Sequence, residues 1–237
     1  MHSLNIVIRD LKLEDILVDE SGYIKLYNLS LHKQLKDVSS EKSFTICGSP
    51  EYLPPEMILG KGYNKSADWW ALGIMFYELV FGSHPFYNQN SEKMYELICF
   101  SELRFPVYKL NNSIVSQECI DIISGLLDKN PSNRIGKKGL ADIKTHAFFT
   151  GFNFEGIDNK KTLAPMCNII SKLSNENCPD VNNKDIFNYK DLKTNVYNNI
   201  YASKDFEVNS SYNNDFSIIS EDKIKLINDN ENLFLDF

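Results

Sequence analysis

Short β-prone runs near the start of the chain predict a β-hairpin. Residues 16–18 and 23–26 are rich in aliphatic, β-branched and aromatic side chains, and residues 19–22 join them in a turn that ends with Gly22. Glycine most readily adopts the positive φ that such a turn requires. The pattern therefore predicts two short antiparallel strands.

Longer segments further along the chain show helical patterns. Residues 68–81 are apolar nearly all round, which is typical of a helix buried at the centre of a domain. Helical spacing also predicts helices over 91–100, 116–128 and 140–146. Pro131 ends the helix predicted over 116–128, because the residue before a proline avoids the α region. A hairpin, a long loop and several helices together predict a mainly α fold.

The composition changes after the last predicted helix. Asparagine becomes abundant from about residue 171 onward. A polar stretch of this kind buries little apolar surface and is typical of an extended tail. Aromatic residues such as Phe187 and Phe216 recur within it, which indicates that parts of the tail contact a globular surface. We therefore expect a globular domain over residues 1–150 and an extended, partly disordered C-terminal tail over 151–237.

Charge and cysteine content narrow the classes of function. The 25 basic and 32 acidic residues of the 237-residue chain give a net charge of −7, so no nucleic acid is expected as a partner. Five scattered cysteines form no CxxC pair, so we expect reduced thiols and a cytoplasmic protein. The longest apolar stretch, 69–81, contains Glu78 and is shorter than the roughly 20 residues of a membrane span.

Candidate catalytic residues lie just before the first strand of the predicted hairpin. Residues 9–15 read RDLKLED. They resemble the catalytic loop of protein kinases, whose usual form is H/Y-R-D-L-K-x-x-N. The resemblance implies that Asp10 orients the substrate hydroxyl and accepts its proton, and that Lys12 contacts the transferred phosphoryl group.

Further segments follow in the order that protein kinases have them. Residues 47–56 (CGSPEYLPPE) resemble the substrate-docking loop with its A-P-E motif, and residues 68–73 (DWWALG) resemble the start of the central helix. The resemblance implies a buried ion pair between Glu56 and Arg134. It also implies that Asp68 accepts hydrogen bonds from the catalytic-loop backbone.

The subgroup is also indicated. The chain resembles the cyclic-nucleotide-dependent branch of the AGC serine/threonine kinases in three segments, TICGSPEYLPPE, GYNKSADWWALG and SELRFP. A weaker resemblance lies in the tail, at residues 185–187 and 235–237. The resemblance implies a protein-kinase-like C-lobe, a helical bundle with a small β-hairpin, followed by an AGC-type tail. We expect the N-lobe to be absent, because the chain contains no G-x-G-x-x-G loop or V-A-I-K strand and starts within a helix of the C-lobe.

The expected metal ligands depart from the family pattern. The family uses ATP and Mg²⁺, and the resemblance implies cofactor contacts from Asp15, Leu17 and Asn28. Asn28 stands where the family has the aspartate of D-F-G, Asp15 replaces the catalytic-loop asparagine, and Ile8 replaces the residue before the arginine. An amide is a weaker Mg²⁺ ligand than a carboxylate. We therefore expect binding of ATP and Mg²⁺ to be weak or absent.

The resemblance also implies a regulatory site. Thr45 stands at the position of the activation-loop phosphothreonine, and Arg9 and Lys33 stand where basic residues surround that phosphate. An unmodified threonine in a solvated loop is the alternative.

Substrate contacts are implied at a further set of positions. Glu14 and Glu78 match acidic residues that bind arginine near the target serine, and Ser49 and Glu51 belong to the docking loop. A glutamate inside an apolar helix is rarely a plain surface residue, so the peptide-binding role is favoured for Glu78. The expected partner is a basic protein or peptide containing serine or threonine.

Two functions remain open on the sequence. The first is a partial AGC serine/threonine kinase domain, catalytically impaired as it stands, working with a separate N-lobe or regulatory chain. The second is a pseudokinase remnant that binds a basic peptide or partner through Glu14, Glu78 and the docking loop. The change from D-F-G to Asn28-Leu29-Ser30, together with Ile8 and Asp15, favours the second.

Overall fold

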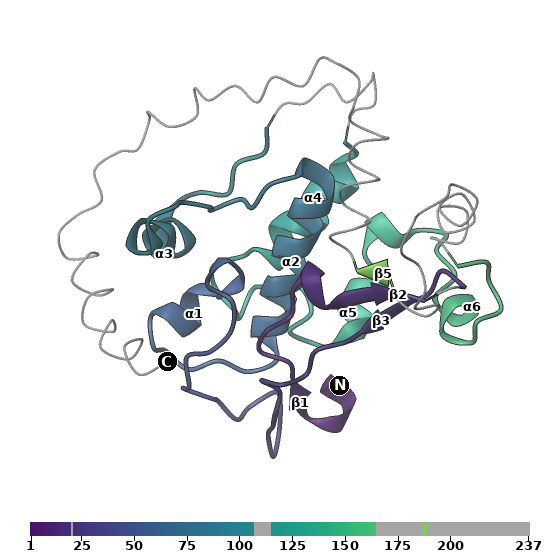
Figure 1. Ribbon diagram of the computed structural model, residues 1–237, viewed down its shortest axis with the longest axis horizontal. Coiled ribbons are helices and arrows are strands. Elements are labelled where there is room, and N and C mark those ends of the chain that lie inside the picture. The colour runs from purple at the N-terminus through teal and green to yellow at the C-terminus, as the bar shows by residue number, and fades with distance from the viewer. Residues whose placement is uncertain (20, 107–114, 165–186, 189–237) are drawn as a thin grey trace. The chain divides into compact units, whose positions relative to one another are not determined.

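The computed structural model describes residues 1–19, 21–106, 115–164 and 187–188 (Figure 1). These residues fall into two compact units. Of the described residues, the first unit holds 1–12 and 29–152, and the second holds 13–28, 153–164 and 187–188.

The first unit is mainly helical. Its α-helices are α1 (Pro55–Ile58), α2 (Ser66–Phe81), α3 (Ser91–Phe100), α4 (Gln117–Leu126) and α5 (Leu140–Lys144). Its 3₁₀ helices are η1 (His2–Leu4), η3 (Pro50–Tyr52) and η4 (Ala147–Phe149). A two-stranded antiparallel sheet pairs β1 (Ile6–Val7) with β4 (Lys33–Gln34).

The second unit is built on a three-stranded antiparallel sheet with the order β3-β2-β5. Its strands are β2 (Ile16–Val18), β3 (Ile24–Leu26) and β5 (Phe187–Asn188), and its helices are η2 (Leu13–Asp15) and α6 (Phe154–Asp158). Ile16 pairs with Leu26, and Val18 pairs with both Ile24 and Phe187. Two residues of the predicted tail therefore add a strand to the predicted hairpin.

The core of the first unit is centred on α2, which lies against α4 (Figure 1). Trp70 and Ile74 of α2 and Ile122 of α4 have no exposed surface. A Cβ atom on Gly73 would lie only 2.8 Å from Leu127, so glycine is needed where α2 meets the end of α4. The apolar pattern of residues 68–81 therefore correctly predicted a central, buried helix.

The predicted elements are present, with small shifts at their ends. Helix α2 begins at Ser66 because the side chain of Asn64 accepts a hydrogen bond from the backbone N–H of Ser66 (3.1 Å). Strand β3 begins at Ile24 because Tyr23 still closes the turn, donating its backbone N–H to Asp19 (3.0 Å). Gly22 adopts a φ of 89° in this turn, as predicted.

Two other helices end earlier than predicted. Helix α4 ends at Leu126, and α5 ends at Lys144 because His146 caps η4 instead, its Nδ1 accepting from the N–H of Phe148 (3.2 Å). Of the tail positions that resemble AGC kinases, 185–186 and 235–237 lie outside the described residues.

Candidate active site

Asp10 joins the predicted catalytic loop to the predicted docking loop within the first unit. Its Oδ1 accepts a hydrogen bond from the backbone N–H of Ser49 (2.7 Å), and its Oδ2 accepts one from Lys12 Nζ (3.1 Å). The same ammonium donates to Ser49 Oγ (2.8 Å). The predicted catalytic pair, Asp10 and Lys12, thus contacts the predicted substrate-binding residue Ser49.

These contacts set the charge on Asp10. Partial burial opposes ionisation of its carboxyl group, but the hydrogen bonds from Ser49 and Lys12 favour the charged form more strongly and leave the pKa lowered. Asp10 is therefore a carboxylate at neutral pH. A carboxylate can accept a hydrogen bond from a hydroxyl group and then its proton.

Glycine is required beside Asp10. Gly48 has a φ of +109°, and a Cβ atom there would lie 2.6 Å from the carbonyl oxygen of Arg9. The docking loop can approach the catalytic loop this closely only because position 48 has no side chain.

Asp68 holds the backbone of the catalytic loop, as the resemblance predicted. Its carboxylate accepts hydrogen bonds from the N–H groups of Ile8 and Arg9, both at 2.9 Å. These bonds hold the backbone of Arg9 at a φ of 70°, which residues other than glycine rarely adopt. His2 Nε2 also lies 2.6 Å from Asp68 Oδ2. Sequence reasoning missed His2, since nothing in its spacing relates it to residue 68.

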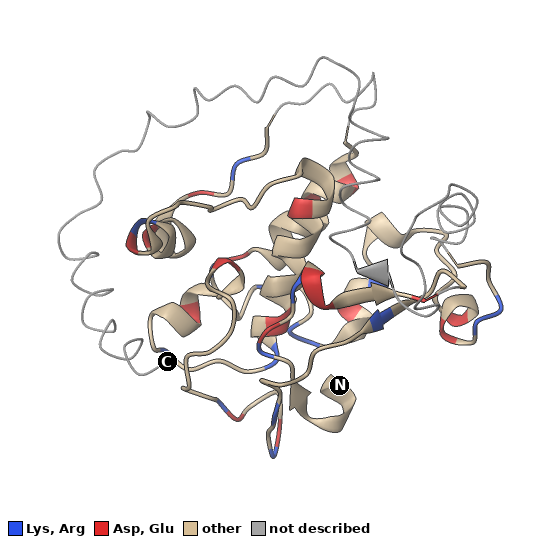
Figure 2. Ribbon diagram, in the orientation of Figure 1, with Lys and Arg blue, Asp and Glu red and all other residues tan. Residues whose placement is uncertain are grey.

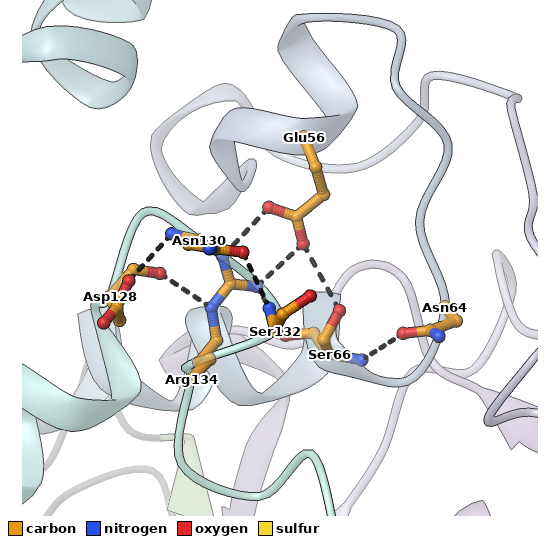
Figure 3. A network of polar contacts seen from close by, with 7 residues as sticks. All are labelled: Glu56, Asn64, Ser66, Asp128, Asn130, Ser132 and Arg134. Atoms are coloured by element: carbon orange, nitrogen blue, oxygen red, sulfur yellow. Dashed lines mark hydrogen bonds and ion pairs between the residues drawn. The ribbon is translucent and has the colours of Figure 1, made fainter.

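The predicted ion pair of Glu56 and Arg134 is confirmed (Figure 3). The guanidinium group donates to both carboxylate oxygens of Glu56, at 2.7 and 2.9 Å, and neither residue is more than 3% exposed. Arg134 also donates to the carbonyl oxygens of Ser66 (2.8 Å) and Asp128 (3.1 Å). The pair therefore ties α1 to the start of α2 and to the loop after α4.

The predicted regulatory residues are linked through a tyrosine that sequence reasoning missed. Tyr63 donates its hydroxyl to the carbonyl oxygen of Thr45 (2.6 Å) and accepts from the guanidinium of Arg9 (3.4 Å). Burial raises the pKa of Tyr63, so it stays a neutral donor. The ammonium of Lys33 donates to Ser43 Oγ (3.2 Å), two residues before Thr45.

Glu78 lies at the buried end of a small polar cluster. Its Oε2 accepts a hydrogen bond from the hydroxyl of Tyr52 (2.9 Å) and lies 3.3 Å from His84 Nε2. The rings of Tyr52 and His84 also pack edge to face. Glu51 is half-buried in η3, and Glu14 is half-buried in the second unit. The two glutamates predicted to bind arginine, Glu14 and Glu78, therefore belong to different units.

The expected metal ligands lie together at one end of the hairpin in the second unit. Asp15 comes directly before β2, Asn28 follows β3 by two residues, and Tyr27 donates its backbone N–H to the carbonyl oxygen of Asp15 (2.9 Å). One carboxylate and one amide are the two oxygen-donor types that the family uses for Mg²⁺, so the residues fit the ion in kind. Leu17, the expected nucleotide contact, is buried in β2. The described residues contain no cluster of three or more metal-binding side chains.

The fold and these contacts match a known family. Residues 1–149 match the protein kinase domain family, so the chain belongs to the protein kinases. The Glu56–Arg134 pair and the Asp68 contacts are those that the resemblance to this family implied. The chain is a protein kinase domain of the AGC serine/threonine type.

Three relatives illustrate the similarity. The chain is 39% identical to the serine/threonine-protein kinase gad8 of Schizosaccharomyces pombe over 185 residues, 78% of this chain. It is 40% identical over 162 residues, 68% of its length, to the serine/threonine protein kinase ypkA of Aspergillus fumigatus. It is 38% identical over 168 residues, 70% of its length, to the human RAC-beta serine/threonine-protein kinase.

The matched part spans 30%, 24% and 33% of these three relatives, respectively. None of the three is named as a cyclic-nucleotide-dependent kinase, so they do not support that predicted subgroup. Protein kinases act on protein substrates with ATP and Mg²⁺. Within the described part of the chain, no helix has the length and apolarity needed to cross a membrane.

Proposed function

We propose that the chain forms the C-lobe of a serine/threonine kinase, the part that holds the protein substrate, and that Asp10 is its catalytic base. The arrangement of Asp10 supports this proposal best. A charged carboxylate, fixed by the docking-loop N–H of Ser49 and by Lys12, can orient a serine or threonine hydroxyl and accept its proton during transfer.

Lys12 and the hairpin end carry the phosphate side of the proposed reaction. The Lys12 ammonium, already 2.8 Å from Ser49 Oγ, would contact the phosphoryl group as it moves to the substrate hydroxyl. Asp15 and Asn28 would hold Mg²⁺, which when bound neutralises charge on the ATP phosphates. We propose that the ion binds more weakly than in kinases with the family pattern, because a neutral amide stands in the place of the D-F-G aspartate.

The proposed substrate is a basic segment that contains serine or threonine. Glu78 is the proposed partner of a substrate arginine, because its carboxylate, 7% exposed, is held in a fixed position by Tyr52 and His84. Glu14 would contribute a second acidic contact, and Ser49 and Glu51 would contact the chain around the target residue. A separate N-lobe or regulatory chain is the proposed protein partner.

Thr45 is the proposed regulatory site. Phosphate on its side chain would attract Arg9 and Lys33, whose charged groups contact Tyr63 and Ser43, the two paired residues beside the Thr45 segment. Within the AGC class we propose a kinase of the gad8, ypkA and RAC-beta kind, since these relatives share 38–40% identity with the chain.

The metal site favours a second candidate, a pseudokinase that binds basic peptides without transferring phosphate. The pseudokinase candidate rests on Asn28, because an amide in the place of the D-F-G aspartate binds Mg²⁺ more weakly than a carboxylate.

One experiment tests both proposals. Radiolabelled phosphate transfer to an Arg-Arg-x-Ser peptide is measured for the chain mixed with a kinase N-lobe, for Asp10→Asn and for Asp37→Asn, a control at an exposed aspartate. The kinase proposal expects a loss of at least about 100-fold in Asp10→Asn and none in the control. Peptide binding without transfer, in a parallel fluorescence titration, would support the pseudokinase. Equal transfer by Asp10→Asn and wild type would contradict the proposed base.

A further inference from the structure

The first unit contains a cavity of about 400 Å³ whose charged lining is entirely basic. Three segments form it: the loop after β4, the residues that lead into α2, and the loop after α4. Its lining includes Lys42, Lys65, Lys137 and Lys138, together with serine, asparagine and tyrosine side chains and no carboxylate. This is unusual in a chain whose net charge is −7.

Lys42 and Lys65 approach the cavity from the first two segments. Lys65 is only 9% exposed, and its ammonium donates to Ser39 Oγ (3.0 Å). The ammonium of Lys42 donates to the carbonyl oxygen of Lys61 (3.2 Å). The acceptors of these hydrogen bonds are thus neutral oxygens, which carry no charge to balance the two ammonium groups.

Lys137 and Lys138 come from the third segment, in a turn of fixed geometry. Gly136 has a φ of +92°, and a Cβ atom there would lie 2.7 Å from the ring of Trp69. The turn therefore packs against α2 through glycine. The ammonium of Lys137 donates to the carbonyl oxygen of Ser132, which also lines the cavity, and Lys138 is exposed.

Nearby carboxylates have partners of their own. Glu56 pairs with Arg134 and accepts a hydrogen bond from the hydroxyl of Ser66 (3.4 Å), a residue of the cavity lining (Figure 3). The pKa of exposed Asp37 is lowered chiefly by a hydrogen bond from Ser40, with a smaller contribution from Lys65. Among the described residues, none of the four cavity lysines forms an ion pair. Elsewhere acidic and basic positions are interspersed, as on α3 (Figure 2).

We propose that this cavity binds a compact molecule that carries two or more phosphate groups. Ammonium groups and hydroxyls are the donors that phosphates prefer, and Lys65 is already largely desolvated, which strengthens its attraction for an anion. Four ammonium groups line the cavity, more positive charge than one phosphate group can balance, which favours a ligand with two or more. The volume is within the range of small-molecule sites, which favours a compact polyphosphate over an extended phosphorylated peptide.

Calorimetry tests the proposal with three probes: inorganic tripolyphosphate, inositol hexakisphosphate and orthophosphate, each at about 150 mM NaCl to screen diffuse attraction. We expect a saturable site with a micromolar dissociation constant for tripolyphosphate or the inositol compound. Orthophosphate should bind at least about tenfold more weakly, since it makes fewer charge-assisted hydrogen bonds with the lysines. The tighter of the two polyphosphates identifies the source of the phosphate groups.

Matched variants locate the site. Lys137→Gln with Lys138→Gln should weaken binding at least about tenfold, and Lys65→Gln should do the same. Lys36→Gln with Lys161→Gln removes the same charge from exposed lysines outside the cavity and should change binding less than about twofold. Thermal melts check that all variants fold, and the exposed pair at 137 and 138 keeps the test decisive if Lys65→Gln unfolds.

Three results would overturn the proposal. The first is no saturable binding of either polyphosphate. The second is an equal loss in the control and the cavity variants, which would indicate diffuse electrostatic attraction. The third is tighter binding of orthophosphate than of either polyphosphate, which would replace the proposed polyphosphate with a single phosphate group.

Discussion

Single residues fix the loops that surround Asp10. Asp68 accepts two backbone N–H groups of the catalytic loop, and Gly48 permits the docking loop to lie against the carbonyl oxygen of Arg9. The catalytic loop is thus tied to α2 through one side chain, and the docking loop meets it at a position without a side chain. The position of Asp10 therefore depends on a few contacts, each of which one substitution can remove.

Gly48→Ala tests this dependence. The added Cβ would lie 2.6 Å from the Arg9 carbonyl oxygen at a φ of +109°, so we expect the free energy of unfolding to fall by about 3 kcal/mol. Gly139→Ala is the matched control, because its φ is +115° and nothing lies within 4 Å of the new atom. It should cost about 1 kcal/mol. Urea unfolding that gave equal losses for both would show that the close approach does not matter.

At the scale of elements, a buried arginine and a half-buried lysine connect the helices of the first unit. Arg134 joins the loop after α4 to α1 through Glu56. Lys129, from the same loop, donates to the carbonyl oxygens of Leu97 and Ile98 at the end of α3, and its ammonium lies 3.8 Å from the centre of the Phe86 ring. The loop after α4 is therefore connected to α1 and to α3 through charged side chains.

The ion pair predicts strong coupling between α1 and this loop. Arg134→Met should lower the free energy of unfolding by about 3–5 kcal/mol, because it leaves the Glu56 carboxylate buried without its partner. Glu56→Leu combined with Arg134→Met should lose less than the sum of the single changes, since both charges are then gone. A double-mutant cycle by urea unfolding measures the coupling, and additive losses would refute it.

Lys129 predicts a pH dependence of stability. Burial lowers the pKa of Lys129 to about 7 in the folded chain, below its ordinary value of 10.5. Above pH 7 the unfolded chain therefore binds more protons at this residue than the folded chain, so stability rises with pH. Between pH 7 and 8 this one group should add about 1 kcal/mol. Urea unfolding should show this rise in the wild type but not in Lys129→Met; identical slopes would contradict it.

Local patterns predicted the elements, and the family motifs predicted many of their contacts. The largely apolar run marked α2, and the family resemblance predicted that Asp68 would accept hydrogen bonds from the catalytic-loop backbone, which come from Ile8 and Arg9. His2 and Tyr63 could not be predicted in their roles, because their partners are distant in the sequence and no periodic pattern connects them. The four cavity lysines come from three separate segments, so only the folded chain shows that they converge.

At the scale of the whole molecule, the residues proposed for catalysis are divided between the two units. Asp10, Lys12 and Ser49, which contact one another, belong to the first unit, whereas Asp15 and Asn28 belong to the second and carry the carboxylate and the amide in the reverse of the family's order. The central claim is that the substrate side of this kinase domain is intact and that the exchanged metal ligands limit its activity.

The most direct test restores the family pattern with Asp15→Asn and Asn28→Asp together. Transfer of labelled phosphate from ATP to an Arg-Arg-x-Ser peptide is measured in the presence of Mg²⁺ and a kinase N-lobe, for the wild type, the double variant and the double variant with Asp10→Ala. The account predicts that the double variant is at least about tenfold faster than the wild type, because a carboxylate then holds Mg²⁺ at the phosphates, and that Asp10→Ala abolishes the gain. No gain in the double variant, or a gain that survives Asp10→Ala, would contradict it.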